Sequence, residues 1–230
     1  MAVLVSSLLT RLNYRLNDPN SSYWTQSERI EYLDEAQKYI INYWKWPWRS
    51  RTESQTLTSG TATYSIPSDL MGEDIHSVYF SSTTHGLTDQ LLIPETLDTF
   101  QTRVSGQTIT NGIPTRYHLA YNSSGTLQIV LDQPPNFTQA SALTIRYYRL
   151  SNTLSATTDS TICPDELTMS LIDYAYAKAK EKEQEFDAAN NTFAMLEARL
   201  NKQKQVYATG NDENLIAMRT PLYGMDELTY

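Results

Sequence analysis

The segment Tyr43–Arg51, "YWKWPWRSR", marks the point at which the sequence changes from a helical to a strand-like pattern. Before it, apolar residues recur at helical spacing, and Pro47 disfavours the helical conformation at the residue that precedes it. After it, short alternating runs rich in Thr, Ser and Tyr are typical of strands. The segment also contains three of the chain's four tryptophans, Trp44, Trp46 and Trp48. We interpret them as an aromatic corner between a helix and the first strand, in which each ring buries roughly 150–250 Å².

Two other interpretations of the tryptophan cluster are weaker. A sugar-binding platform needs exposed aromatic rings on a sheet face, whereas these rings follow a helix. A membrane anchor needs a basic amphipathic helix, but several acidic residues precede the tryptophans on the same helix: Glu28, Glu31, Asp34 and Glu35. No apolar run approaches the roughly 18 residues of a membrane span. We therefore expect no membrane contact.

Helical spacing dominates the N-terminal residues. Leucines at four-residue steps predict a helix near residues 3–16: Leu4, Leu8, Leu12 and Leu16. In the following "TQSE", Thr25 can accept a hydrogen bond from the Glu28 amide while the Glu28 side chain accepts one from the Thr25 amide. This capping box predicts the start of a second helix, which should end before Pro47.

Helical spacing returns after Pro164, and we expect a helix that continues to roughly residue 184. A further helical segment follows, which Gly210 should end. Asp187 is a possible cap for this segment and favours a break near residues 184–187.

The predicted fold class is α+β. Residues 1–50 and 161–210 contribute the N-terminal and C-terminal helices of one helical bundle, and residues 51–160 form an inserted antiparallel β-rich domain. Residues 211–230 are too apolar for an ordinary solvated tail and lack helical spacing. We expect them to form an extended docking tail.

Composition and motifs argue against catalysis and against free-standing DNA binding. The 18 Lys and Arg residues face 26 Asp and Glu residues, which gives a formal charge of -8 and few cations for phosphate contacts. The single cysteine, Cys163, permits no intrachain disulfide and no cysteine metal cluster, and it favours the reducing cytoplasm. His76, His85 and His118 lack ligand spacing. We therefore expect no enzyme, no metal and no cofactor.

Two charged stretches have simple structural interpretations. The carboxylates Asp69, Glu73 and Asp74 indicate a solvated turn rather than a cleft. The stretch "KAKEKEQE" at residues 178–185 predicts a solvated helix face with ion pairs between residues four apart.

Several pieces of the sequence form a recognisable series when taken in order: "WTQSERIEYLDEAQKYI" with its "LDEAQ" core, "YWKWPWR", "TATYSIPSDL", "GIPTRYHLAYN", "LQIVLDQPPNFTQASALTIRYYRLSNTLS" and "CPDELTMSLIDYAYAKAKEKE". Together they resemble the head-to-tail adaptor (connector, or ring) proteins of tailed bacteriophages, including the tail-tubular-protein-A group. The resemblance covers nearly all of residues 3–208.

This resemblance implies a structural protein of the virion, made in the bacterial cytoplasm and placed at the head-tail junction. Such proteins form rings, typically of twelve subunits, that join the portal to the tail and continue the DNA channel. The implied partners are the portal protein, tail or nozzle proteins and other copies of the chain, while genomic DNA passes without specific binding. The alternatives are another completion ring (a stopper or tail terminator) and, from a different class, a carbohydrate-binding module, which would require exposed tryptophans.

In this family the C-terminal extension commonly reaches onto the portal. The resemblance therefore implies that the apolar residues after Gly210 dock there: Leu215, Ile216, Met218, Leu222, Tyr223, Met225, Leu228 and Tyr230. An acidic channel wall would repel phosphate, and residues 180–185, "KEKEQE", are a candidate for it by sequence.

Overall fold

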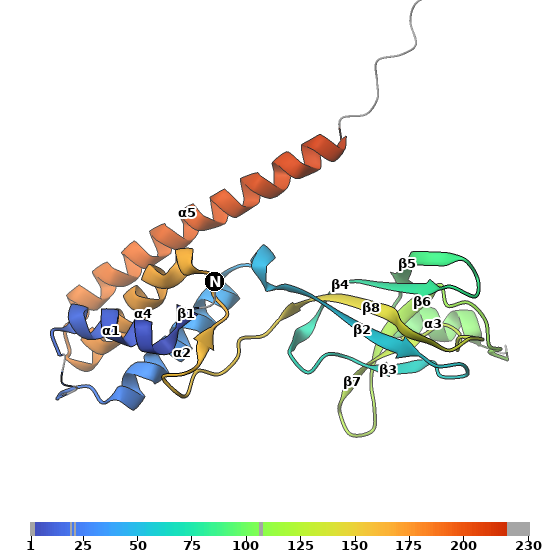
Figure 1. The fold of residues 1–230 in the computed structure, drawn as a ribbon, viewed down its shortest axis with the longest axis horizontal. Coiled ribbons are helices and arrows are strands. Elements are labelled where there is room, and N and C mark those ends of the chain that lie inside the picture. The colour runs from blue at the N-terminus through green and yellow to red at the C-terminus, as the bar shows by residue number, and fades with distance from the viewer. Residues whose placement is uncertain (1–2, 19, 21, 106–107, 220–230) are drawn as a thin grey trace, which may run out of the picture. The chain divides into compact units, whose positions relative to one another are not determined.

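The computed structural model describes residues 3–18, 20, 22–105 and 108–219, with side chains up to residue 208. The chain divides into two compact units. The helical unit combines Met1–Trp48 with Ser151–Tyr230, and the β unit is Arg49–Leu150. Figure 1 shows helices gathered in the first unit and strands in the second. The fold class is therefore α+β, as the sequence predicts.

The helical unit is built from four α-helices, within the described residues, and two short strands. They are α1 (Val5–Leu16), α2 (Gln26–Tyr43), α4 (Thr168–Lys182) and α5 (Phe186–Arg219), with β1 (Val3–Leu4) paired antiparallel to β9 (Ser160–Thr161). Their apolar faces meet in one core, to which Leu12, Leu33, Leu171 and Leu196 contribute fully buried side chains. Because α1 and α2 precede the β unit and α4 and α5 follow it, this core joins both ends of the chain.

The start of α2 confirms the capping box. The Thr25 hydroxyl accepts from the Glu28 amide at 3.3 Å, and the Glu28 carboxylate accepts from the Thr25 amide at 2.8 Å. The helix ends at Tyr43, ahead of Pro47, which begins the 3-10 helix η1 (Pro47–Arg49).

In the C-terminal helices, the predicted break is present but the predicted helix end is wrong. A break does separate α4 from α5, and Gln184 adopts a left-handed φ of 64° within it. Asp187, however, lies in the first turn of α5, where its charge complements the helix dipole. Gly210 does not end the helix, which continues to Arg219. Glycine inside a helix costs only about 1 kcal/mol relative to alanine, and the residues that follow it include several good helix formers.

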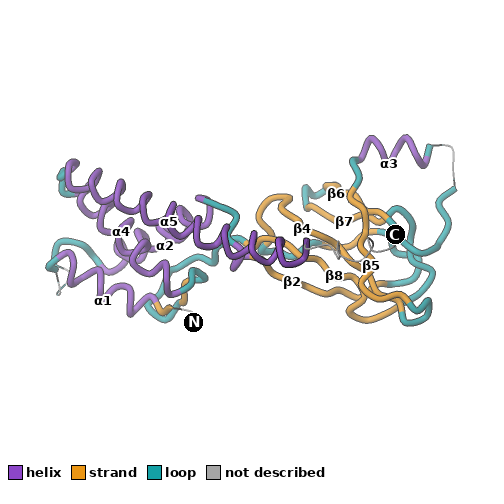
Figure 2. Tube along the Cα trace, turned by 90° about the horizontal axis from the view of Figure 1, so that it is seen from above, coloured by secondary structure: helices purple, strands orange, loops and turns teal. Residues whose placement is uncertain are grey.

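The β unit contains one curled sheet. Its strands are β2 (Ser50–Leu57), β3 (Thr63–Ser65), β4 (Leu70–Ser82), β5 (Leu87–Pro94), β6 (Arg116–Tyr121), β7 (Leu127–Leu131) and β8 (Gln139–Arg149). They lie in the order β2-β8-β4-β5-β6-β7-β3. Alternate residues bury a second core, which includes Val78, Leu92, Ile129 and Ile145. Figure 2 shows these strands in orange and, apart from them, the short helix α3 (Leu97–Val104), which connects β5 to β6 along the chain.

The sheet is mixed, so the prediction of an antiparallel domain is wrong in one place. Strands β5 and β6 run parallel, with Ile93 opposite Arg116. The physical reason is α3, which connects the two strands as a crossover and returns the chain to the end of the sheet at which β5 began. The sequence analysis missed this helix, although Thr96 caps it by accepting from the Thr99 amide at 3.2 Å.

Candidate functional site

The aromatic corner is compact and largely buried within the helical unit. Trp46 is fully buried, and its indole Nε1 donates to the Ile40 carbonyl at 2.6 Å. Its ring packs edge-on against Trp44 at 5.2 Å, stacks on Trp48 at 6.1 Å and meets Tyr207 of α5 edge-on at 5.7 Å. The arrangement joins the end of α2 to α5 and offers no exposed platform at Trp46 for a sugar ring.

Buried polar residues of α2 hold the chain that returns from the β unit. Gln37 is fully buried, and its amide donates to the Asn152 carbonyl at 2.7 Å while its oxygen accepts from the Ile162 amide at 2.9 Å. One turn earlier, Asp34 accepts from the Leu154 amide at 2.8 Å. Both residues belong to the "LDEAQ" stretch, so this motif pairs apolar core residues with side chains that fix residues 152–162. The sequence analysis did not foresee this contact.

Asp173 of α4 joins three helices. Its side chain is 2% exposed and forms ion pairs with Arg15 of α1 and with Arg199 of α5, the latter at 2.8 Å. Arg15 also lies over the Tyr176 ring, 4.4 Å from the ring centre. This buried carboxylate therefore fixes the register of α1 and α5 against α4.

The charged end of α4 is paired differently from the prediction. Lys178 contacts Glu181 at 2.9 Å and Lys180 contacts Glu183 at 2.6 Å, so the pairs are three residues apart. A four-residue step would join Lys178 to Lys182, which has the same charge. The expected four-residue ion pairs are therefore wrong.

The carboxylates of the β unit do not converge. Asp69 lies in a turn, as predicted, and its partly exposed carboxylate accepts from the Tyr147 hydroxyl at 2.6 Å and pairs with Arg51 at 2.7 Å. Burial, together with this hydrogen bond, raises the pKa of Tyr147. Glu73 and Asp74 lie in β4 instead, so the turn prediction is wrong for them. Glu73 instead accepts from the Tyr121 hydroxyl at 3.2 Å. Among the described residues, no group of three or more His, Cys, Asp or Glu side chains is placed to hold a metal ion.

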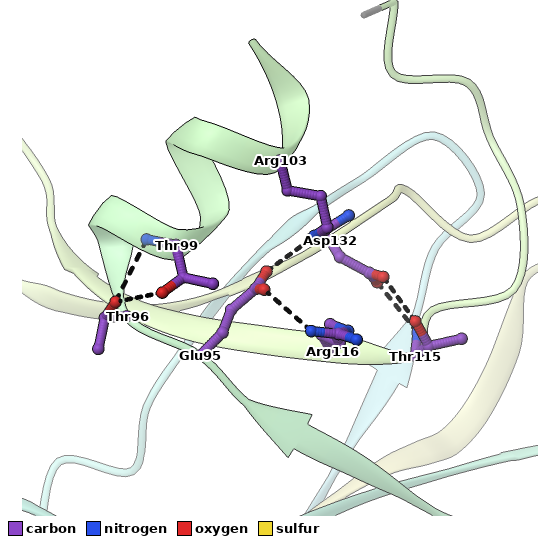
Figure 3. A network of polar contacts seen from close by, with 7 residues as sticks. All are labelled: Glu95, Thr96, Thr99, Arg103, Thr115, Arg116 and Asp132. Atoms are coloured by element: carbon purple, nitrogen blue, oxygen red, sulfur yellow. Dashed lines mark hydrogen bonds and ion pairs between the residues drawn. The ribbon is translucent and has the colours of Figure 1, made fainter.

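A polar network fixes α3 on the sheet (Figure 3). Glu95, at the end of β5, pairs with Arg103 of α3 at 2.6 Å and with Arg116 of β6 at 3.7 Å. Nearby, Asp132 accepts from the Thr115 hydroxyl at 2.7 Å and from its amide at 3.0 Å. Through Glu95, these contacts hold the β5–α3–β6 crossover together.

Beside this network lies a groove of about 700 Å³, formed by β4, β5, β6 and the start of α3. Exposed aliphatic side chains line it: Leu91 (58% exposed), Ile93 (53%) and Leu97 (45%). We refer to it below as the β-unit groove. Contiguous exposed apolar side chains are typical of interaction surfaces. The sequence analysis did not single out these residues.

The residues expected to dock on the portal fall at the edge of the described structure. Helix α5 contains three of them, Leu215, Ile216 and Met218, which are therefore not part of an extended tail. The structure does not describe their side chains. The remaining docking residues lie outside the described residues altogether: Leu222, Tyr223, Met225, Leu228 and Tyr230.

The comparison with protein families is decisive. The SU10 adaptor protein family matches residues 4–218, which include both units. The chain belongs to this family. It is a family of phage head-to-tail adaptors rather than of enzymes, and it places the adaptor among virion components. No curated protein matches the chain.

Two further features of the described residues concern helix hydrophobicity and the histidines. Among the helices that the structure describes, none combines the length and the apolar character of a bilayer-spanning segment. The histidines remain apart: His85 contacts Asn136 at 3.1 Å, His76 contacts Ser77 at 3.2 Å, and His118 packs on Phe100.

Proposed function

We propose that the adaptor assembles into a ring of twelve copies that joins the portal to the tail and continues the DNA channel. The observation that carries this proposal is the family match over residues 4–218. A closed ring needs two different complementary surfaces on each subunit. The helical unit would form the bundle through which neighbouring copies meet, and the β unit would face the tail.

Exposed apolar side chains on the helical unit support contacts between copies. Tyr14 of α1 is 91% exposed, and Met169 of α4 is 45% exposed. They line a groove of about 590 Å³ together with Arg11 and the buried Ile172. Aromatic residues, Met and Arg are enriched at protein interfaces. This combination suits the lateral surface of a ring subunit.

The acidity of the chain supports a passive DNA channel. Twelve copies at -8 each would carry -96 formal charges. DNA binding depends mainly on cationic side chains, so such a wall would let DNA pass without retaining it. Residues 180–185 are our candidate for the wall. Both lysines of this stretch are already paired with glutamates: Lys180 with Glu183 and Glu185 in the turn after α4, and Lys182 with Glu28 of α2.

The C-terminal residues are our candidate for portal docking. The helix that reaches Arg219 would present Leu215, Ile216 and Met218, and residues 220–230 would add the remaining apolar side chains. An extended segment can bind by placing alternate side chains in partner grooves while its backbone pairs with partner strands.

The test is assembly on the purified cognate portal ring, with complexes imaged and weighed. Three chains are compared: the full chain, a chain that ends at Arg219 and a chain that ends at Ala208. A full-length variant with residues 220–230 in scrambled order controls for length and charge. We expect only the full chain with its natural sequence to add a stoichiometric second ring.

The shortened chains locate the contact. If the chain ending at Arg219 binds and the chain ending at Ala208 does not, the end of α5 carries the contact. Absence of binding by the full chain would overturn portal docking. A tail-side completion ring, such as a stopper or tail terminator, would then be the better assignment.

A further inference from the structure

The β-unit groove presents aliphatic side chains at strand spacing. Leu91 and Ile93 lie two residues apart on β5, so both side chains point to the same face, roughly 7 Å apart along the strand. Both are more than half exposed, while Leu92 between them is fully buried. A partner with apolar side chains at alternate positions would match this spacing.

His118 gives an independent indication of a ligand. It lies on β6, lines the groove and is only 4% exposed. One side of its ring packs on Phe100 of α3, with 4.4 Å between ring centres. Its Nδ1 has no hydrogen-bond partner within the part of the chain that the structure describes. A buried polar atom without a partner destabilises the free protein, and a ligand that supplies a hydrogen bond removes that destabilisation.

The edge of β6 offers a place for an added strand. The β5-β6 ladder comprises only two pairs, Ile93 with Arg116 and Pro94 with Tyr117. Strand β6 continues to Tyr121 and pairs there with β7 on its other edge. Beyond Tyr117, none of the described strands pairs with the edge that faces the groove. Extended peptides bind to free sheet edges of this kind.

The charge of the groove favours a segment of another protein over the adaptor's own C-terminal residues as its ligand. Glu73 lies on the rim of the groove, and Arg103 and Arg116 already pair with the other carboxylate, Glu95. Residues 220–230 contain two acidic residues and no Lys or Arg, so they complement this rim poorly. A basic segment of another protein fits better.

We propose that the β-unit groove binds an extended segment of a tail-side protein, with aliphatic side chains at alternate positions and a Lys or Arg facing Glu73. This inference rests on the proposed function, because it takes the partner from the tail side of the junction. In the complex, the segment covers Leu91 and Ile93, extends the edge of β6 and supplies the hydrogen bond that His118 lacks.

The test uses the full adaptor chain and the purified tail-side protein that assembles on it, both intact and as short overlapping fluorescent peptides. Binding is measured by fluorescence anisotropy. We expect consecutive peptides with alternating aliphatic residues and a basic residue to bind the wild type. Ile93→Glu should weaken that binding by at least roughly tenfold, as expected for an anchor at the centre of an interface.

Two further variants separate docking from folding. Ile109→Glu changes an aliphatic side chain of similar exposure outside the groove, and it should leave peptide affinity within about twofold, as is usual for a residue that makes no contact with the ligand. His118→Leu removes the unpaired nitrogen but keeps an apolar side chain. It should leave the thermal midpoint equal or higher and still lower the peptide affinity, which a purely structural histidine would not do.

The outcomes separate this proposal from the proposed function. If the intact tail-side protein binds the wild type while no peptide binds in a manner that Ile93→Glu disrupts, the groove assignment is wrong and the adaptor function stands. If the intact tail-side protein does not bind the wild type at all, both are overturned.

Discussion

Replacing Asp173 with Asn should loosen the helical unit without changing its shape. The carboxylate is 2% exposed and lies between Arg15 and Arg199. Asparagine has the same size but carries no charge, and it presents one acceptor oxygen and one donor amide. At least one of the two guanidinium groups would therefore face a donor instead of an anion.

The magnitude follows from burial. Removing one partner of a buried ion pair typically costs about 3–5 kcal/mol, because the other charge is left uncompensated. The side chains of the two arginines are 30% and 31% exposed, although the Arg199 nitrogen that faces Asp173 is buried. Water can therefore replace the lost carboxylate only in part. We therefore expect a loss of about 2–3 kcal/mol in the free energy of unfolding. At about 3 °C per kcal/mol for a chain of this length, the thermal midpoint should fall by about 6–9 °C.

The tryptophans provide a selective assay. All four lie between residues 24 and 48, within the helical unit. Urea unfolding followed by tryptophan emission therefore reports on this unit, while far-ultraviolet circular dichroism reports on the whole chain. The matched control is Glu181→Gln, which removes an ion pair with Lys178 whose side chains are 38% and 32% exposed. An exposed pair contributes about 0–1 kcal/mol.

If Asp173→Asn changed the unfolding free energy by no more than Glu181→Gln does, the buried carboxylate would not hold the three helices together. A double-mutant cycle with Arg199→Gln sharpens the test. Because the two residues are in contact, the double variant should lose less than the sum of the single variants. Strict additivity would mean that this ion pair contributes nothing to stability.

Three further predictions concern the same unit. Thr25→Ala should lower the urea-unfolding free energy by about 1 kcal/mol, because the α2 cap is lost; an unchanged midpoint would contradict this. Trp46→Ala should cost about 3–5 kcal/mol by urea unfolding, because a fully buried ring is removed; a loss below 1 kcal/mol would mean that the corner is dispensable. The hydrogen bond from Lys182, and those from Thr25, lower the pKa of Glu28 from 4.5 to about 2. The contribution of the ionised Glu28 carboxylate to stability is therefore complete above pH 4.5 and is lost as the pH falls to 2. The difference in urea midpoint between wild type and Glu28→Gln should shrink over that range, and a constant difference would exclude this linkage.

Local patterns predicted the helices of the helical unit but not every helix boundary. Thr25 and Glu28 act within one turn, so their capping box could be read from four residues. The end of α5 could not be read from Gly210, because its cost is small compared with the propensity of the surrounding residues. The glycine signal alone therefore placed the helix end too early.

The parallel β5-β6 pair was missed because of a short helix. In "ETLDTFQTRV", residues 95–104, the threonines resemble the strand-rich composition around them. Yet Thr96 is followed by Leu97, Phe100 and Val104 at helical spacing, which is the pattern that could have revealed α3. Because residues 51–160 were judged by their overall composition, this helix was not predicted. The crossover that makes β5 and β6 parallel was therefore missed as well.

The contacts of Asp34 and Gln37 depend on a part of the chain more than one hundred residues away. Nothing in α2 alone shows which of its polar residues will be buried. Burial of these residues depends on the segment that returns from the β unit. Its Leu154 and Ile162 amides need hydrogen-bond acceptors when the segment packs on α2. Sequence patterns identify amphipathic faces, but such a long-range partner appears only in the folded chain.

Two departures from ordinary burial, one in each unit, have opposite causes. In the helical unit, charged and polar residues such as Asp173 and Gln37 are buried, but each has partners and fixes one helix or segment against another. In the β unit, Leu91 and Ile93 are exposed and His118 is buried with an unpaired nitrogen. The first arrangement is satisfied within the chain and therefore explains the fold. The second leaves apolar surface and a polar atom unsatisfied in the same groove, and this coincidence is the basis of our proposal that another chain binds there.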